Sequence, residues 1–176
     1  MRVVAGELGG RKLLSPPGDE TRPTTDRVRE AIFNTLYSLD AVEGANVLDA
    51  FAGSGALGIE ALSRGAAHVT FCERARPTLQ TLRDNIATLD VGARSTVVPG
   101  DALTHLARNT DGYDLVLLDP PYLFDQWDEL IGAVNHDALL VIESGRELAL
   151  PSPWTAQRVK RYGGTVVTLA TRGKSA

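Results

Sequence analysis

The residues best suited to chemistry are four consecutive ones, Asp119, Pro120, Pro121 and Tyr122, which follow the apolar run 113–118. Two adjacent prolines fix the backbone and can continue neither a strand nor a helix. Asp119 and the Pro120 carbonyl can accept the two N–H hydrogens of an amino group, and Tyr122 can stack on a base at about 1–3 kcal/mol. The pattern is typical of a site that orients an aromatic amine for group transfer to its nitrogen. The alternative is a plain turn with an Asp cap and a packing Tyr.

A glycine-rich segment earlier in the chain predicts a cofactor loop. Gly53, Gly55 and Gly58 satisfy G-x-G-x-x-G, which permits a tight turn and close approach of a ligand. The motif alone fits a dinucleotide as well as another adenosyl cofactor. Asp49 ends the preceding strand, where a carboxylate repels a pyrophosphate but suits a cationic amino group. No basic residue lies in the loop, so the pattern favours S-adenosylmethionine.

Acidic residues also follow the next two predicted strands. Glu73 can accept hydrogen bonds from both ribose hydroxyls, or it is simply a surface residue at a strand end. Asp101 can accept from an adenine amino group or cap the following helix, and the sequence leaves both roles open. The predicted cofactor-binding residues are Asp49, Ala50, Phe51, Gly53, Ser54, Gly55, Glu73, Arg74, Asp101 and Ala102.

The elements that must position these residues alternate regularly. Strands are predicted at 46–50, 67–72, 95–98, 113–118 and 138–143, and helices near 56–64, 75–89, 102–108 and 125–133. Apolar strands separated by helices predict an α/β fold, a mostly parallel sheet with helices on both faces. Ligands bind such sheets outside the carboxyl ends of the strands. Residues 155–162 and 165–171, joined at Gly163-Gly164, predict a closing antiparallel hairpin that brings the sheet to seven strands.

The first part of the chain has a different pattern. Residues 2–6 and 11–14 predict a small β-hairpin, and the proline-rich residues 15–24 predict a linker. We therefore expect an N-terminal extension over 1–22 and the main domain over 23–176. A helix is predicted to follow the linker, with Thr25 as a cap and with apolar residues at helical spacing. These are Val28, Ile32, Leu36 and Leu39.

Composition limits the classes of function. The 176 residues carry a net charge of −4 and contain one cysteine, Cys72, so neither an internal disulfide nor a cysteine metal cluster can form. The three histidines are scattered, and we expect no metal. No apolar run approaches a membrane span and no signal peptide is recognisable, so we expect a cytoplasmic protein. The charge is uneven, because residues 158–176 hold five basic residues and no acidic one.

Two longer segments resemble a known family. Residues 22–34, RPTTDRVREAIFN, and residues 49–65, DAFAGSGALGIEALSRG, are similar to the bacterial 16S rRNA guanine-N2 methyltransferases of the RsmD family. These are class I S-adenosylmethionine-dependent methyltransferases with a Rossmann-like fold. The resemblance covers nearly the whole chain. It implies S-adenosylmethionine as cofactor and, as substrate, a guanine of 16S rRNA in the assembled or assembling small ribosomal subunit.

The resemblance also implies roles for individual residues. In the family, the segment matching 22–34 lies near the cofactor and the N-terminal hairpin helps to hold the substrate. This implies positions beside the site for Thr24, Arg29 and Asn34, and RNA contacts for Arg2, Arg11, Lys12 and Arg22. Relatives often have Arg-Gly-Arg-Lys-Leu where this chain has Gly9-Gly10-Arg11-Lys12-Leu13, so the hairpin lacks one basic residue. We expect a monomer.

Three other functions remain as alternatives. An adenine-N6 methyltransferase acting on DNA or RNA uses the same tetrapeptide chemistry, but such enzymes usually carry an added target-recognition domain for which this chain has no room. A dehydrogenase is disfavoured by Asp49 and the closing hairpin. A ribosome-assembly factor without activity can retain the same fold, and intact cofactor and catalytic motifs speak against it.

Overall fold

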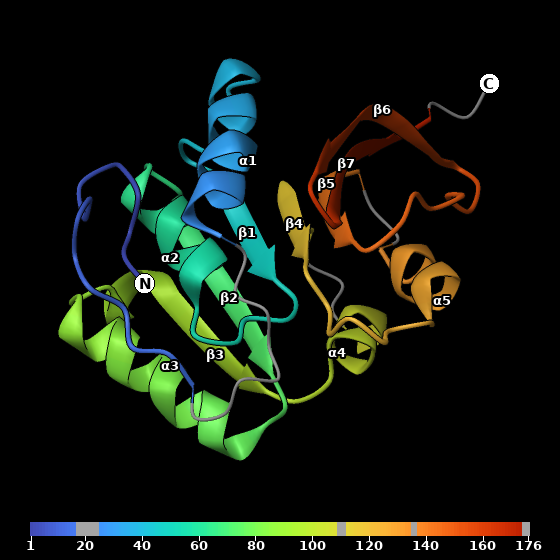
Figure 1. Cartoon of the computed structure of the whole chain (residues 1–176). Coiled ribbons are helices and arrows are strands. Elements are labelled where there is room, and N and C mark those ends of the chain that lie inside the picture. The colour runs from blue at the N-terminus through green and yellow to red at the C-terminus, as the bar shows by residue number, and fades with distance from the viewer. Residues whose placement is uncertain (17–24, 109–111, 135–136, 174–176) are drawn as a thin grey trace.

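A seven-stranded sheet forms the centre of the computed structural model, which describes residues 1–16, 25–108, 112–134 and 137–173 (Figure 1). The strands are β1 Asn46–Asp49, β2 His68–Glu73, β3 Ser95–Pro99, β4 Leu115–Leu118, β5 Leu139–Ser144, β6 Trp154–Tyr162 and β7 Thr165–Arg172. Their order across the sheet is β3-β2-β1-β4-β5-β7-β6. Strands β1 to β5 pair in parallel, and β7 is antiparallel to both β5 and β6. The expected fold is thus confirmed.

Helices cover both faces of the sheet, as the run of apolar strands predicts. The helices are α1 Asp26–Ser38, α2 Ala56–Ser63, α3 Arg76–Thr88, α4 Ala102–Arg108 and α5 Trp127–Gly132, with a short 3-10 turn at Gly92–Arg94. Helices α1, α2 and α3 share one apolar cluster with alternate residues of the strands, such as Leu117 and Val141. Helices α4 and α5 share a second cluster with Leu118 and Ile142 on the opposite face.

Helix α1 follows its sequence pattern except at its end. The Thr25 hydroxyl accepts a hydrogen bond from the Val28 amide at 3.3 Å, so Thr25 caps the helix as expected. Val28, Ile32 and Leu36 are buried. Leu39 is instead 55% exposed, because the helix stops at Ser38 and the residue no longer follows the helical period.

The N-terminal segment packs on the main core. An antiparallel bridge joins Arg2 to Lys12, in place of the longer hairpin strands that were expected. Val3 and Leu13 are buried in the cluster shared with α1, α2 and α3. Side chains of α2 and α3 accept hydrogen bonds from two further amides of the segment and so hold it on the core. The proposed boundary near residue 22 lies outside the described residues.

The closing hairpin turns at Gly163, which has a φ of 60°, as a two-residue turn between strands requires.

Within the described ranges, no helix is both long enough and apolar enough to cross a bilayer.

Candidate functional site

The glycine loop and the tetrapeptide leave adjacent strand ends. Strands β1 and β4 are parallel neighbours, with Asp49 in register with Leu117. The Ala50 amide donates to the Leu117 carbonyl at 3.1 Å, just before the two chains separate. Asp119 follows two residues later and is close enough to raise the pKa of Asp49. The two motifs therefore form one site at the carboxyl edge of the sheet.

Neighbouring elements hold the glycine loop in place. The Ala52 amide donates to the Cys72 carbonyl at 2.9 Å, and the Gly53 amide donates to Glu73 Oε2 at 3.0 Å. Gly55 begins α2 at φ 85°, and a Cβ there would lie 2.6 Å from Leu82 Cδ1, so this glycine lets α2 approach α3. A Cβ on Gly53 would meet nothing closer than 4.0 Å. Gly53 is therefore the loop glycine that a ligand can approach.

Asp49 is a buried acid among other acids. It is 1% exposed, and its Oδ2 accepts a hydrogen bond from the Gly58 amide at 2.9 Å. Burial first, and then the nearby Asp119 and Glu73 carboxylates, raise the pKa of Asp49 to about 7. In the described part of the chain, no basic side chain lies within 4.0 Å of Asp49 or Glu73. This surplus of negative charge fits a cationic ligand.

The other predicted acids already accept backbone hydrogen bonds. Glu73 Oε1 accepts from the Ala75 amide at 2.8 Å, in addition to the bond from Gly53. Asp101 Oδ2 accepts from the Thr104 amide at 2.9 Å and from its hydroxyl at 3.0 Å, so the capping role is confirmed. Each carboxylate oxygen has two lone pairs, and both residues retain capacity for a ligand. Their cofactor contacts stay predictions.

The remaining cofactor candidates differ in exposure. Ala50 and Ser54 are buried, and the Ser54 carbonyl accepts from Asn85 Nδ2 at 2.8 Å. Ala102 is buried at the start of α4 and Arg74 is exposed beside Glu73. These residues lie around the carboxyl ends of the strands. Their role in binding the cofactor stays a prediction, and their positions are consistent with it.

The tetrapeptide forms a rigid turn with one prominent ring. Pro120 is buried, Asp119 is half-buried and Pro121 is exposed, with the Pro121 carbonyl accepting from the Phe124 amide at 2.9 Å. Tyr122 is 80% exposed. Its ring lies against Gly145, where a Cβ would be 3.1 Å from Tyr122 Cε2. The exposed face of Tyr122 is thus available for stacking.

Aromatic contacts connect the two motifs, and sequence reasoning missed them. Phe124 meets Phe51 of the glycine loop edge to face, with ring centroids 5.5 Å apart. Phe124 also meets Trp127 of α5, with centroids 5.2 Å apart. Edge-to-face pairs contribute about 0.5–1.5 kcal/mol each beyond burial. The only signal in the sequence was the presence of aromatic residues soon after Tyr122.

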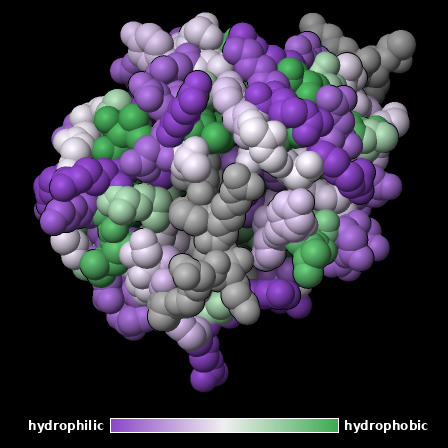
Figure 2. Space-filling view, viewed as in Figure 1, coloured by the Kyte–Doolittle hydropathy of each residue, from purple (hydrophilic) through white to green (hydrophobic). Residues whose placement is uncertain are grey.

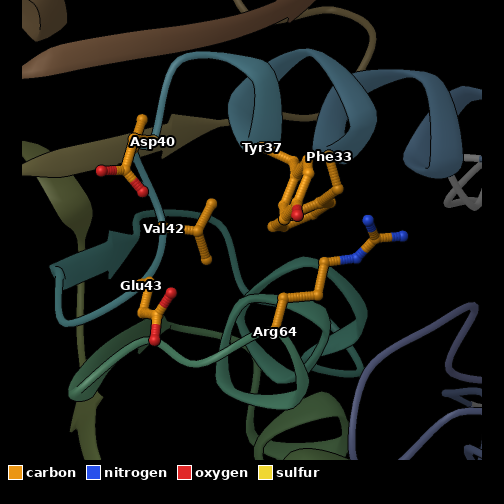
Figure 3. Close-up of a pocket in the computed structure, with 7 residues that line it drawn as sticks. Phe33, Tyr37, Asp40, Val42, Glu43 and Arg64 are labelled. Carbon is orange, nitrogen blue, oxygen red and sulfur yellow. The ribbon is translucent and has the colours of Figure 1, made fainter.

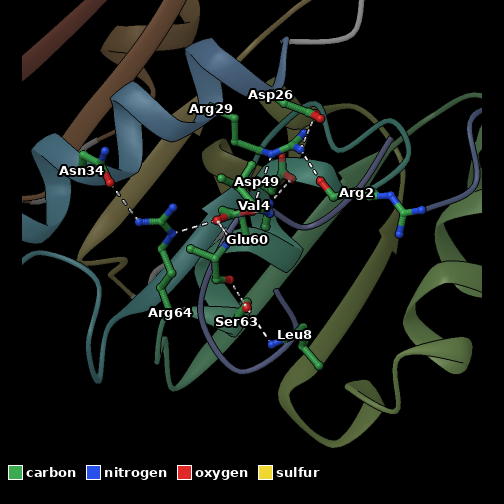
Figure 4. A network of polar contacts seen from close by, with 12 residues as sticks. Arg2, Val4, Leu8, Asp26, Arg29, Asn34, Asp49, Glu60, Ser63 and Arg64 are labelled. Carbon is green, nitrogen blue, oxygen red and sulfur yellow. Dashed lines mark hydrogen bonds and ion pairs between the residues drawn. The ribbon is translucent and has the colours of Figure 1, made fainter. Parts of the chain in front are cut away.

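Arg29 lies at the centre of a buried polar network between α1 and α2 (Figure 4). It is fully buried and pairs with Asp26 at 2.8 Å and with Glu60 at 3.6 Å. Its Nη2 also donates to the Arg2 carbonyl. Glu60 accepts from the amides of residues 4 and 5, so the network fastens the N-terminal segment to α2.

Asn34 belongs to the outer end of this network. Arg64 donates to Glu60 at 2.8 Å and to Asn34 Oδ1 at 3.4 Å. The contacts that the structure records for Arg29 and Asn34 therefore join α1, α2 and the N-terminal segment. Their proposed place beside the cofactor stays a prediction. Thr24 and Arg22 lie outside the described residues.

The basic residues of the N-terminal segment are exposed. Arg2 Nη1 donates to the Gly10 carbonyl at 2.7 Å, and Arg11 Nη2 donates to the Thr88 carbonyl of α3 at 3.1 Å. Lys12 is exposed beside them. The RNA contacts of these residues stay predictions.

A small cavity lies at the other edge of the sheet, between the ends of α1 and α2 (Figure 3). Phe33, Tyr37 and Arg64 form one side of it, and Asp40 and Glu43 lie across from them. None of the predicted cofactor or catalytic residues lines it.

Among the described residues, no group of three or more His, Cys, Asp or Glu side chains could hold a metal ion.

Comparisons with known proteins agree over the full chain. The model of the family described as "Conserved hypothetical protein 95" matches residues 1–171. The Escherichia coli protein named "Ribosomal RNA small subunit methyltransferase D" is 40% identical, covering 98% of this chain and 90% of the relative. Its Haemophilus influenzae namesake is 35% identical, covering 93% and 89%. The solved structure of the Escherichia coli protein yhhF has a TM-score of 0.85 at 40% identity, covering 98% and 97%.

Proposed function

The chain belongs to the family described as "Conserved hypothetical protein 95" and has the class I methyltransferase fold, and from this we propose that it methylates ribosomal RNA of the small subunit. The proposed donor is S-adenosylmethionine. The proposed acceptor is the exocyclic amino group of a guanine in 16S rRNA, in the assembled or assembling subunit. The observation that carries the proposal is the meeting of a buried acidic cofactor loop with Asp119–Tyr122 at adjacent strand ends.

The residues present fit the proposed cofactor. Asp49 and Glu73 supply negative charge beneath the glycine loop, and Gly53 leaves its surface open. These features suit a ligand with an ammonium group and a sulfonium. When bound, S-adenosylmethionine supplies an electrophilic methyl group. We assign the ammonium-facing role to Asp49 and the ribose-facing role to Glu73.

Residues of the tetrapeptide orient the base. Asp119 and the Pro120 carbonyl accept the two N–H hydrogens, which directs the nitrogen lone pair away from them. Tyr122 stacks on the base, which must first leave any duplex or stack that holds it. The nitrogen would gain the methyl group as the bond from that methyl to the sulfonium sulfur breaks, leaving S-adenosylhomocysteine, and Asp119 would accept the proton that the nitrogen loses. Proximity and orientation account for most of the acceleration.

The names of the relatives support small-subunit rRNA as the substrate and do not favour the adenine-N6 alternative, while guanine as the target base follows from the resemblance described above. Proteins 35–40% identical over nearly their full length are named as small-subunit ribosomal RNA methyltransferases. We further propose that the protein works in the cytoplasm as a monomer without a metal.

One experiment tests the proposal directly. Purified protein is incubated with labelled S-adenosylmethionine and with small subunits, or naked rRNA, from a strain that lacks the enzyme. The RNA is then digested and the labelled nucleoside identified. We expect N2-methylguanosine. Labelled N6-methyladenosine would support the adenine alternative, and the absence of any labelled nucleoside would overturn the proposal.

A further inference from the structure

The outer strand β6 is unusually exposed for a strand of this sheet. Residues 155–161 are all exposed, whereas residues 166–170 of the neighbouring β7 are all buried. Strand β6 is also the last strand of the sheet, at the end opposite β3 (Figure 1). Figure 2, viewed as Figure 1, shows mostly hydrophilic residues over this part of the molecule. An edge strand of this kind is accessible along its whole length.

The exposed strand is positively charged in an acidic protein. Arg158, Lys160 and Arg161 lie on β6, and the sequence contains no acidic residue after Glu147. Arg161 lies 3.9 Å from Glu147, an exposed pair of little energetic weight. In the described part of the chain, no carboxylate lies within 4.0 Å of Arg158 or Lys160. The charges of these two residues are therefore available to an anionic partner.

These two residues share one wall of a shallow groove between β6 and α1. Arg158, Lys160 and Tyr162 line the groove from alternate positions of β6, so neighbouring side chains stand about 7 Å apart. Val167 and Leu169 of β7 form its floor. The α1 wall is small and neutral, because it consists of Ala31, Ile32 and Thr35. The groove thus has regularly spaced positive charges on its β6 wall and small neutral side chains on its α1 wall, which leave space for a ligand between the two walls.

Strand register places the end of this groove near the catalytic loop. Arg161 pairs with Val166, which pairs with Ser144, two residues beyond Ile142. Ile142 is in register with Leu118, the residue before Asp119. The turn of the hairpin therefore lies at the same edge as the tetrapeptide, three strands or about 14 Å away. An extended anion that follows the groove reaches this edge at Tyr162, the last of the three groove residues of β6.

We propose that β6 and the facing side of α1 bind the sugar-phosphate backbone of the RNA substrate beside the target nucleotide. Arg158 and Lys160 contact phosphates along the groove, and Tyr162 lies at the end nearest the catalytic loop. The proposal rests on the proposed function and adds to it a docking surface. Charge complementarity favours RNA over another protein strand, because every charged side chain of β6 is basic.

The test compares two pairs of substitutions with the same change in charge. Arg158→Gln with Lys160→Gln alters the groove. Arg76→Gln with Arg83→Gln is the control on exposed positions of α3, at the opposite end of the sheet. Binding of a labelled small-subunit rRNA fragment is measured by fluorescence anisotropy at several salt concentrations. Methylation kinetics and S-adenosylmethionine affinity are measured on the same preparations.

We expect the groove variant to bind RNA at least tenfold more weakly at about 0.1 M salt, while the control changes less than twofold. The slope of log affinity against log salt should fall by about 1.4, or about 0.7 per lost phosphate contact on a single strand. The KM for RNA should rise while kcat and cofactor affinity stay within about twofold. Exchanging the two cations, R158K with K160R, should retain binding, because the charge is kept.

Each other outcome overturns the proposal. Equal weakening in both variants would show a general charge effect, and unchanged binding in the groove variant would show that RNA docks elsewhere. A stable dimer in sedimentation that buries β6 would assign the edge to a second copy. If the wild type methylates rRNA and the groove variant does so equally well at low RNA concentration, only this inference fails. If the wild type neither binds nor methylates rRNA, the proposed function fails with it.

Discussion

Two groups of charges, each built around a fully buried carboxylate, lie close together in this protein and differ in their balance. The first, here called the paired cluster, consists of Arg29, Glu60 and Arg64, and each arginine has Glu60 as a partner. The second, the acidic cluster, consists of Asp49, Glu73 and Asp119, whose carboxylates raise the pKa of Asp49. Burial alone therefore does not distinguish structural from functional charges. The balance of charge does.

The difference follows from the energetics of buried ions. A buried ion is tolerated when an opposite charge and hydrogen bonds offset its desolvation. The paired cluster meets this condition and fastens three segments together. Asp49 of the acidic cluster accepts a hydrogen bond from the Gly58 amide and still has a raised pKa, so its buried carboxylate is unfavourable in the ligand-free protein and suits a cationic ligand.

Breaking the paired cluster should have the largest effect on stability. Glu60→Gln leaves the fully buried Arg29 without its buried acid, and we expect a loss of about 3–5 kcal/mol in the free energy of unfolding. Urea denaturation measures it. Glu30→Gln, an exposed change on α1, is the control and should stay within about 0.5 kcal/mol. Equal stability of the two variants would contradict a structural role for the cluster.

Removing Asp119, the proposed acceptor for the amine, should affect turnover and leave folding intact. Asp119→Ala should lower kcat about 10²–10³-fold, because one acceptor that orients the amine is lost. Cofactor affinity, measured by calorimetry, should change less than about threefold. Asp125→Ala, an exposed change in the same loop, should leave kcat unchanged. Unfolding of the Asp119 variant would favour the purely structural turn.

Neutralising Asp49 of the acidic cluster should lower the affinity for the cofactor and raise the stability of the ligand-free protein. Asp49→Asn keeps an acceptor for the Gly58 amide but removes the buried charge, so cofactor affinity should fall about tenfold or more. The ligand-free variant should be about 1–3 kcal/mol more stable at about pH 8, where wild-type Asp49 is ionised. Asp114→Asn, at the opposite end of β4, is the matched control. Unchanged affinity would remove Asp49 from the site.

The smallest expected effect is on pH dependence. The pKa of Asp49 is about 7, so cofactor affinity should rise about fourfold from pH 6.5 to about pH 8 as the carboxylate forms. Stability should change in the other direction. The folded protein keeps a proton on Asp49 that the unfolded chain releases above about pH 4, so this residue's contribution to stability falls as pH rises from about 4 to 7. Both trends should disappear in Asp49→Asn.

Local patterns predicted the fold and the meeting of the two motifs. The alternation of apolar strands and helices predicts a parallel sheet, and parallel strands bring Asp49 and Asp119 to one edge. The Thr25 cap and the Gly163 turn also depend only on neighbouring residues. These features are predictable because their causes lie within a few residues of each other.

Contacts between distant segments were not predictable in this way. Arg29 occupies a polar helix position that also suits a solvated face, and its burial depends on Glu60 and on the Arg2 carbonyl. The spacing of Gly53 and Gly55 does not tell which one faces the ligand, since that depends on Leu82 of α3. The Phe51–Phe124 contact likewise requires the packing of two loops.

The hydrogen bonds that hold the N-terminal segment on the core also determine when this segment can fold during synthesis. The amides of Val4 and Ala5 bond to Glu60, and the amide of Leu14 bonds to Asn85 Oδ1. During synthesis these partners leave the ribosome only after some fifty to seventy further residues have been added, at about 5–20 residues per second. The N-terminal segment must therefore wait several seconds after its own synthesis for the surface on which it packs.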